Sequence, residues 1–282
     1  LDKITGFIFC TFGETKSEYD ISVQPYPIIM NPIALITGAT SGIGAASARR
    51  LASLGYNLII TGRRSERLQN IADEIRAEYP VEILPLSFDV RNREEVETHL
   101  GNLPDPWQAV SVLVNNAGLA AGLDPIQSGD IEDWERMIDT NIKGLLYVTR
   151  TISPGMIARG AGHIINIGSI AGKEVYSNGN VYCATKHAVD ALSKAMRIDM
   201  LPYGIKVTQI CPGAVETEFS LVRFHDDQAK ADAVYKGFTP LCANDIAECI
   251  AAVLNLPDNI CINDMVVMPK AQAGSGHFFK QV

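Results

Sequence analysis

Tyr182 and Lys186 are the two residues of this sequence whose types and spacing most directly suggest chemistry. They lie four residues apart in a segment with a helical pattern, so both side chains are expected on one face, about one turn apart. A tyrosine hydroxyl ordinarily titrates near pKa ~10, and a neighbouring ammonium favours the phenolate, which accepts a proton. The pair therefore indicates acid–base chemistry near neutral pH.

On its own, this spacing is more often found on an ordinary amphipathic helix, where Tyr182 would pack and Lys186 would be solvated. Three further signals favour a site. Ser169 lies 13 residues before Tyr182, at the end of a predicted strand, where its hydroxyl reaches the carboxyl edge of the sheet and holds a substrate oxygen. Residues 115–118 and 212–217 follow two other predicted strands and are expected at the same edge.

A phosphate-binding turn is predicted at residues 37–44, Thr-Gly-Ala-Thr-Ser-Gly-Ile-Gly. A strand precedes it and a helix follows, so backbone N–H groups approach a pyrophosphate at the positive end of the helix. The G-x-x-x-G-x-G spacing alone is weak evidence, and an ordinary glycine turn is the alternative. The strand–turn–helix context, with a second strand ending about 20 residues later, favours a dinucleotide.

The second strand ends in Thr61-Gly62-Arg63-Arg64, without the acidic residue that would accept hydrogen bonds from the ribose of NAD. A planar, permanently charged guanidinium matches a phosphate, so Arg63 and Arg64 favour NADP. The alternative is that both arginines begin a solvated helix. Cations at a helix start oppose its dipole, which argues for another role.

The elements that position these residues alternate between short β-branched or leucine-rich segments and longer helical segments. This pattern predicts an α/β fold, a doubly wound (Rossmann) seven-stranded parallel sheet with helices on both faces, in a single domain. The strands are predicted at 33–37, 57–61, 82–88, 110–114, 163–168, 205–210 and 260–268, and the helices at 43–54, 66–78, 93–101, 132–158, 181–200 and 244–254.

The chain divides at residue 30. Residues 1–29 mix short apolar pieces with two prolines and are interpreted as an N-terminal extension of unknown role: an expression remnant, an upstream in-frame translation ahead of Met30, or a true arm. Residues 30–282 form the predicted cofactor-binding and catalytic domain. Residues 271–282 contain glycine and serine and are expected to be loosely ordered.

Composition excludes several classes of protein. With 282 residues at 47% hydrophobic, the chain buries one substantial core. A net charge of −8 repels nucleic acid and anionic membrane surfaces. Six irregularly spaced cysteines suggest neither a metal site nor a disulfide framework. No apolar run approaches the ~20 residues of a membrane span, so a cytoplasmic protein is expected.

Taken together, residues 37–44, 115–118 and 212–213, with Asn141, Ser169, Tyr182 and Lys186, resemble the short-chain dehydrogenase/reductase family over about residues 32–272. The resemblance implies that Tyr182 is the general acid/base, that Lys186 lowers its pKa and binds the nicotinamide ribose, that Ser169 orients substrate and that Asn141 holds a relay water. With the residues predicted above, the implied cofactor contacts are Gly38, Thr40, Ser41, Gly42, Ile43, Gly44, Arg63, Arg64, Asp89, Val90, Asn116, Ala117, Gly118, Tyr182, Lys186, Pro212, Gly213, Val215 and Thr217.

Longer stretches, such as EDWERMIDTNIKGLLYVTR and VETEFSLVRF, resemble the 3-hydroxy acid dehydrogenase branch of that family, which includes serine 3-dehydrogenases. This similarity implies NADP-dependent oxidation of L-serine, L-allo-threonine or a related 3-hydroxy acid, or reduction of the matching carbonyl. It also implies a homotetramer or dimer, with the helices predicted at 132–158 and 181–200 pairing across a two-fold axis.

A 3-hydroxy acid needs a cation for its carboxylate, and Arg223 is the candidate. It lies just beyond Thr217, in a segment that forms a mobile substrate lid in the family, although a solvated loop arginine is an equal alternative. Glu174, five residues after Ser169, is a candidate for the ammonium of serine, and an exposed loop glutamate is the alternative.

Three other functions are alternatives to this one. A silent NADP-binding regulator does not need the intact set of Ser169, Tyr182 and Lys186. A serine hydrolase is disfavoured because residues 168–172, Gly-Ser-Ile-Ala-Gly, do not match the G-x-S-x-G nucleophile pattern. A reductase of another carbonyl keeps the same mechanism, and only the resemblance to the branch argues against it.

Overall fold

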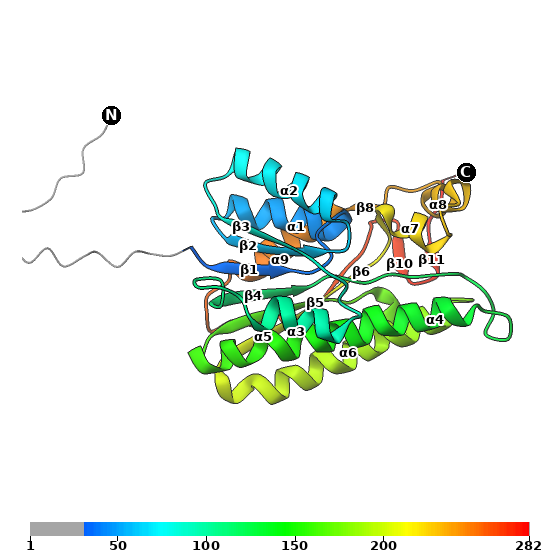
Figure 1. Ribbon diagram of the computed structural model, residues 1–282. Coiled ribbons are helices and arrows are strands. Elements are labelled where there is room, and N and C mark those ends of the chain that lie inside the picture. The colour runs from blue at the N-terminus through cyan, green and yellow to red at the C-terminus, as the bar shows by residue number, and fades with distance from the viewer. Residues whose placement is uncertain (1–30, 282) are drawn as a thin grey trace, which may run out of the picture. The chain divides into compact units, whose positions relative to one another are not determined.

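The computed structural model describes residues 31–281, and a seven-stranded sheet runs through them (Figure 1). The strand order is β3-β2-β1-β4-β5-β6-β9, and every neighbouring pair is parallel. The predicted doubly wound sheet is therefore confirmed, and the strand order reverses between β1 and β4. The strands are β1 Ile33–Ile36, β2 Asn57–Gly62, β3 Ile83–Ser87, β4 Val110–Asn115, β5 Gly162–Ile167, β6 Ile205–Pro212 and β9 Asp264–Val267. The predicted extension at residues 1–29 lies outside the described residues.

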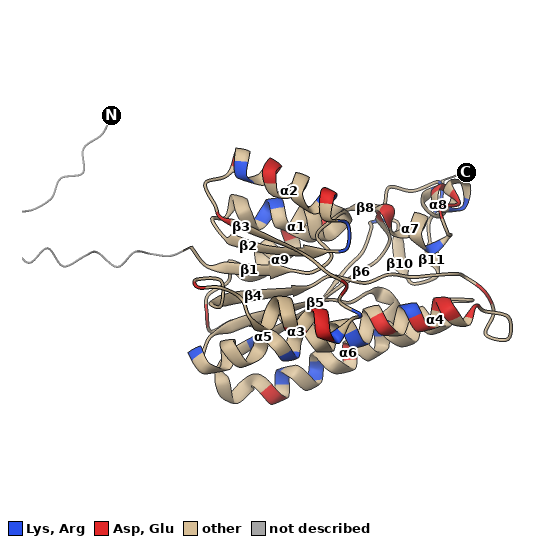
Figure 2. Ribbon diagram, viewed as in Figure 1, with Lys and Arg blue, Asp and Glu red and all other residues tan. Residues whose placement is uncertain are grey.

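The central strand β1 shows why the sheet is covered on both faces. Its side chains alternate: Ala34 and Ile36 belong to one apolar core, and Ile33 and Leu35 to the other. Strands β1 to β5 contain no Asp, Glu, Lys or Arg, so the charged residues lie mainly on helices and connecting segments (Figure 2). Burial on both faces accounts for the nearly continuous apolar runs in the sequence.

Helices cover the two faces in separate groups (Figure 1). The first group packs on the core that contains Ile36, and the second on the core that contains Leu35. The first group is α1 Gly42–Ser53, α2 Ser65–Glu78 and α9 Ala243–Leu254. The second is α3 Arg93–Gly101, α5 Leu145–Arg159 and α6 Asn180–Met200. Within the described residues, no helix combines the length and apolar composition needed to cross a membrane.

The helix predicted at 132–158 contains a local change of winding. It consists of α4 Ile131–Ile138, a π-helical turn at Asp139–Gly144 and α5 Leu145–Arg159. A π-turn inserts an extra residue without breaking the helix. The helix predicted at 132–158 therefore has nearly the predicted length, but it is not α-helical throughout. Asn141 lies within the π-helical turn.

Beyond the carboxyl ends of the strands, short elements enclose the site (Figure 1). They are the parallel pair β7 Val215–Glu216 and β8 Leu241–Cys242, the helices α7 Glu218–Arg223 and α8 Gln228–Tyr235, and the antiparallel pair β10 Gln272–Gly274 and β11 His277–Phe278. The expectation of a loosely ordered end at 271–282 is wrong over this pair. Gln272 is buried, and its side-chain oxygen accepts a hydrogen bond from the Ala214 N–H at 2.8 Å, which fixes the segment.

Candidate active site

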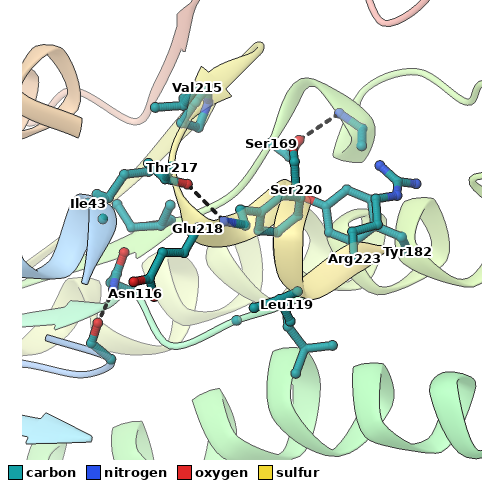
Figure 3. Close-up of a pocket in the computed structure, with 18 of the residues that line it drawn as sticks. Ile43, Asn116, Leu119, Ser169, Tyr182, Val215, Thr217, Glu218, Ser220 and Arg223 are labelled. Atoms are coloured by element: carbon teal, nitrogen blue, oxygen red, sulfur yellow. Dashed lines mark hydrogen bonds between the residues drawn. The ribbon is translucent and has the colours of Figure 1, made fainter. Parts of the chain in front are cut away.

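A cavity of about 620 Å³ lies at the carboxyl ends of the strands, where the strand order reverses. It collects the predicted cofactor, catalytic and substrate residues except Gly44, Asn141 and Glu174. Figure 3 shows Tyr182 and Arg223 together at one end, with Ile43 and Asn116 at the other. The topology therefore brings together segments that are far apart in the sequence.

The glycine turn supplies a close, backbone-lined wall. Gly38 and Gly42 have φ values of +68° and +52°, in the left-handed region that favours glycine. Gly44 does not line the cavity, yet a Cβ there would lie 2.3 Å from the Gly38 carbonyl oxygen. Its role is close packing of α1 against the turn. Asn116 holds the turn by donating from Nδ2 to the carbonyl oxygens of Thr37 at 2.8 Å and Gly38 at 3.2 Å.

The two arginines predicted to bind a 2′-phosphate differ in their surroundings. Arg64 donates to the hydroxyls of Thr40 and Ser41, both at 2.9 Å, and to Glu218 at 2.9 Å. Arg63 also lines the cavity, and within residues 31–281 it has no hydrogen bond or ion pair. Arg64 is therefore held by hydrogen bonds and an ion pair within the protein, whereas the guanidinium of Arg63 has no such partner among the described residues.

Asp89 lies at the cavity, where the resemblance implies an adenine contact. Its carboxylate accepts from the Arg91 guanidinium at 2.6 and 2.9 Å and from the Arg91 N–H at 3.0 Å. Partial burial raises the pKa of this carboxyl, but the hydrogen bonds from Arg91 outweigh burial and leave the pKa below its ordinary value. Asp89 is therefore ionised and held in one orientation.

Helix α6 brings Tyr182 and Lys186 into the cavity, and both side chains are buried. The Lys186 ammonium donates to the Ile167 carbonyl oxygen at 2.9 Å. Burial lowers the pKa of Lys186 to about 8. Burial, with the neighbouring Tyr176, raises the pKa of Tyr182 above its ordinary value, while a hydrogen bond with Ser169 and the charge of Arg223 act in the opposite direction. The phenol is thus a neutral proton donor in the cofactor-free protein.

Ser169 follows β5 directly and is the N-cap of a short 3₁₀ helix, Ile170–Gly172. Its Oγ accepts a hydrogen bond from the Ala171 N–H at 3.1 Å. That bond orients the hydroxyl toward the cavity beside Tyr182 (Figure 3).

Asn141 does not line the cavity. Its Oδ1 accepts from the Leu119 N–H at 2.8 Å, and its Nδ2 donates to the Leu119 carbonyl oxygen at 2.8 Å and to Thr185 Oγ1 at 3.0 Å. The side chain thus joins the segment after β4 to the helix that carries Tyr182. The relay water implied for Asn141 stays a prediction.

Of the two residues predicted to contact the substrate, Arg223 lines the cavity beside Tyr182 and Glu174 does not line it. The Arg223 guanidinium donates to Tyr176 Oη at 2.9 Å and lies 5.5 Å from the centre of the Tyr182 ring. Glu174 accepts from the Ser275 N–H at 2.7 Å and is absent from the residues that line the cavity. The backbone of the C-terminal segment satisfies its carboxylate, so this geometry does not favour contact between Glu174 and a substrate ammonium.

The cavity residues that sequence reasoning missed include three that contact Arg223, Arg64 or Tyr182. Tyr176 holds Arg223, Glu218 pairs with Arg64, and Phe219 packs edge-on against Tyr182 with ring centres 5.6 Å apart. Glu218 and Phe219 lie in the stretch that carries the resemblance to the branch, the one signal that pointed toward them.

Comparison with known proteins identifies close relatives. A profile described as short chain dehydrogenase matches residues 32–228. NADP-dependent 3-hydroxy acid dehydrogenase YdfG of Salmonella typhi is 48% identical over 245 residues, which cover 86% of this chain and 97% of that protein. Sulfoacetaldehyde reductase 2 of Chromohalobacter salexigens is 47% identical over 247 residues, covering 87% and 97%.

The solved structures agree with this result. A closed form of serine dehydrogenase complexed with NADP+ is 45% identical and covers 89% of this chain and 100% of that chain, with a TM-score of 0.82. Serine dehydrogenase from Escherichia coli is 42% identical and covers 86% and 99%, with a TM-score of 0.74. The resemblance predicted from the sequence motifs is confirmed.

Proposed function

The chain belongs to the short-chain dehydrogenase family, and from that premise we propose that it is an NADP-dependent oxidoreductase of 3-hydroxy acids such as L-serine or L-allo-threonine, or of the matching carbonyl compounds. One observation favours an anionic substrate over an uncharged one. The Arg223 guanidinium lies 5.5 Å from the ring of the proposed acid/base, Tyr182.

The residues present fit NADP. The glycine turn brings backbone close to the cavity at the start of α1, and the Lys186 ammonium lies in the same cavity beside Gly118. Arg63 and Arg64 are the proposed partners of the 2′-phosphate. When bound, NADP supplies the hydride acceptor for oxidation or the hydride donor for reduction.

The chain's own residues move the proton. In reduction, neutral Tyr182 gives its phenolic proton to the substrate oxygen, which Ser169 holds in place. In oxidation, Tyr182 must first be a phenolate that can accept the proton, and its raised pKa in the cofactor-free protein disfavours that ionised form. The positive charges of Lys186 and Arg223 favour that phenolate. Burial of Tyr182 and Lys186 keeps water away from the proton transfer.

Arg223 is the proposed partner of the substrate anion. Its Nε donates to the Gly122 carbonyl oxygen at 3.3 Å and its Nη2 to Tyr176 at 2.9 Å, so two anchors fix the plane of the guanidinium. Within residues 31–281, Nη1 makes no hydrogen bond, which leaves a donor for a carboxylate oxygen. A pre-oriented guanidinium loses less conformational entropy on binding than a free side chain.

A sulfonated aldehyde is the second candidate substrate. The 47% identity to sulfoacetaldehyde reductase 2 is nearly equal to the 48% identity to the 3-hydroxy acid dehydrogenase. A sulfonate and a carboxylate are both oxyanions, so Arg223 alone does not discriminate between them. The mechanism proposed for Tyr182 and Ser169 is the same for either compound.

A substrate panel tests the proposal. Absorbance of NADPH would be followed with L-serine, L-allo-threonine, 3-hydroxypropionate, 3-hydroxyisobutyrate and sulfoacetaldehyde, and with uncharged 2-propanol as the control substrate. We expect Arg223→Leu to raise KM for the anionic substrates at least about tenfold, because each loses a charge-assisted hydrogen bond. The KM for 2-propanol should be nearly unchanged, and Arg223→Lys should retain part of the affinity for the anionic substrates.

Two outcomes contradict these assignments. An unaltered KM for the anionic substrates in Arg223→Leu would remove this residue from the substrate site. Tight NADPH binding with no turnover of any compound in the panel would instead favour the alternative function, a catalytically silent NADP-binding regulator.

We also propose a homotetramer, located in the cytoplasm. Large apolar side chains are exposed along α4, α5 and α6, as expected of helices that pair across a two-fold axis; they are Ile131, Ile138, Leu146 and Ile198. The described cysteines are free thiols, in keeping with a reducing compartment. Light scattering that gives a monomer at micromolar concentration would contradict the assembly.

A further inference from the structure

Glu218 pairs with two arginines from a distant part of the sequence. It is the first residue of α7, whereas Arg64 and Arg67 lie at the start of α2. Glu218 Oε2 lies 2.9 Å from Arg64 Nη1, and Oε1 lies 2.7 Å from Arg67 Nη1. One carboxylate therefore bridges two cations that come from a part of the chain about 150 residues earlier.

The first of these cations, Arg64, is one of the two residues proposed to bind the 2′-phosphate, with Arg63. A carboxylate and a phosphate are both oxyanions that accept hydrogen bonds from a guanidinium. They also repel one another at close range, so both cannot use Arg64 fully at the same time. Arg67 differs, because it pairs with Glu218 and does not line the cavity.

We propose that Glu218 is a cofactor-selectivity residue: its carboxylate competes with the 2′-phosphate for Arg64, and Arg67 keeps hold of Glu218 when the phosphate takes Arg64. The inference rests on the proposed use of NADP. It assigns Glu218 a role that weakens NADP(H) binding and leaves NAD(H), which has no 2′-phosphate, without competition.

The exposure and charge of these groups fit an exchangeable contact. The side chains of Glu218, Arg64 and Arg67 are 41%, 42% and 52% exposed. Ion pairs that are this exposed are weak and exchange readily. Partial burial raises the pKa of the Glu218 carboxyl, but the hydrogen bonds from Arg64 and Arg67 outweigh it and keep the pKa below its ordinary value. The competing charge is therefore present throughout the neutral range.

The ion pairs of Glu218 also connect the arginines at the start of α2 to the segment that contains α7 and α8. Thr217, directly before Glu218, lies against the glycine turn, since a Cβ on Gly42 would be 3.3 Å from the Thr217 Cβ. Thr217 also caps α7 by accepting from the Phe219 N–H at 3.2 Å. Glu218 thus projects from a fixed point above the turn, and only its side chain has to move to release Arg64.

Binding of NADPH and NADH to the full chain tests the proposal without any substrate. Dissociation constants would be measured by calorimetry for the wild type, Glu218→Gln and the control Glu66→Gln. Glu66 is an exposed acid in the first turn of α2, and it has no ion pair within residues 31–281. The two variants therefore make the same charge change near the same arginines.

For Glu218→Gln we expect the Kd for NADPH to fall about threefold to fivefold, the range set by loss of an exposed ion pair. The Kd for NADH should be nearly unchanged, and Glu66→Gln should move neither value. An unchanged or higher Kd for NADPH in Glu218→Gln, or an equal fall for both cofactors, would overturn the proposal.

A double-mutant cycle with Arg67→Gln tests the second half of the proposal. In the presence of Glu218, loss of Arg67 should weaken NADPH binding about twofold, because the carboxylate then holds Arg64 alone. In the Glu218→Gln background the same change should have no effect. Equal weakening in both backgrounds would mean that Arg67 contacts the phosphate itself and would overturn this assignment.

Arg64→Gln separates this inference from the proposed function. If the wild type binds NADPH no better than NADH, or if Arg64→Gln leaves NADPH binding intact, the proposed use of NADP fails. If Arg64→Gln weakens NADPH binding but Glu218→Gln has no effect, only the competition by Glu218 fails.

Discussion

Replacing Lys186 with methionine should stabilise the cofactor-free protein at neutral pH while removing its activity. Burial lowers the pKa of Lys186 from 10.5 to about 8, because the folded protein disfavours its positive charge. At about 1.4 kcal/mol per pH unit, this difference corresponds to roughly 3 kcal/mol. Loss of the hydrogen bond to the Ile167 carbonyl oxygen offsets roughly 1 kcal/mol. We expect Lys186→Met to unfold with a free energy about 1–3 kcal/mol higher than the wild type at pH ~7.

The dependence on pH gives the clearest signature. Below the folded pKa of about 8, Lys186 is charged in both states and its burial penalty is fully present. Between about 8 and 10.5 the unfolded chain keeps a proton that the folded protein has lost, so wild-type stability rises with pH. The advantage of Lys186→Met should therefore be constant up to about pH 8 and then shrink toward zero near pH ~10.5.

Urea unfolding of the cofactor-free proteins at several pH values between about 7 and 10 measures this difference, because other titrating groups affect both proteins equally. Lys194→Met is the matched control, since its side chain lies on the same helix and is 61% exposed. We expect that variant to change stability little, with no trend across this pH range. A Lys186→Met protein that is less stable than the wild type at pH ~7, or a difference that is independent of pH, would refute the reasoning.

Three further predictions follow from the site and the core. Tyr182→Phe should lower kcat at least about 100-fold while NADPH binding measured by calorimetry survives, and retention of a tenth of the activity would contradict its role as acid/base. Gly44→Ala should lower Tm and weaken NADPH binding at least about tenfold, because its Cβ would lie 2.3 Å from the Gly38 carbonyl oxygen; unchanged binding would show that α1 shifts easily. Burial, with the charge of Lys206, lowers the pKa of His163 from 6.5 to about 4, so this group contributes stability above pH 6.5 that is lost as pH falls toward 4. His163→Gln should show a shallower loss of unfolding free energy over that range, and parallel curves would contradict the assignment.

The sequence was sufficient to predict the sheet and most of the cavity, because both depend on periodic or locally spaced signals. Tyr182 and Lys186 share a helix face, and the glycine turn joins a strand to a helix, so each could be placed without knowing the remaining fold. Contacts between distant loops have no such signal. The pairing of Glu218 with Arg64, which are 154 residues apart, depends on how the α7–α8 segment folds over the glycine turn.

One predicted strand boundary was wrong. The last strand begins at Asp264, although the apolar pattern suggested 260. A short apolar run can belong either to the loop that precedes a strand or to the strand itself, and the sequence pattern does not separate the two. Glu174 was proposed for the substrate ammonium because it lies close to Ser169 in sequence. In the structure it accepts a hydrogen bond from the Ser275 N–H, and its contact with a substrate stays a prediction. Nearness in sequence did not reveal the competing partner.

The π-turn at Asp139–Gly144 has a consequence for how insertions and deletions affect this chain. The buried residues Met137 and Leu145 are eight positions apart, whereas two α-helical turns take about 7.2 residues. The helix is thus one residue longer than a regular helix with the same buried face, and the turn absorbs the surplus. Deleting a single residue there would restore regular hydrogen bonding and place Met137 and Leu145 seven positions apart, so their shared face would change direction by only about 20°. Asp133 and Met137 would therefore keep their buried face, whereas Asn141, which lies within the turn, would lose its place between Leu119 and Thr185.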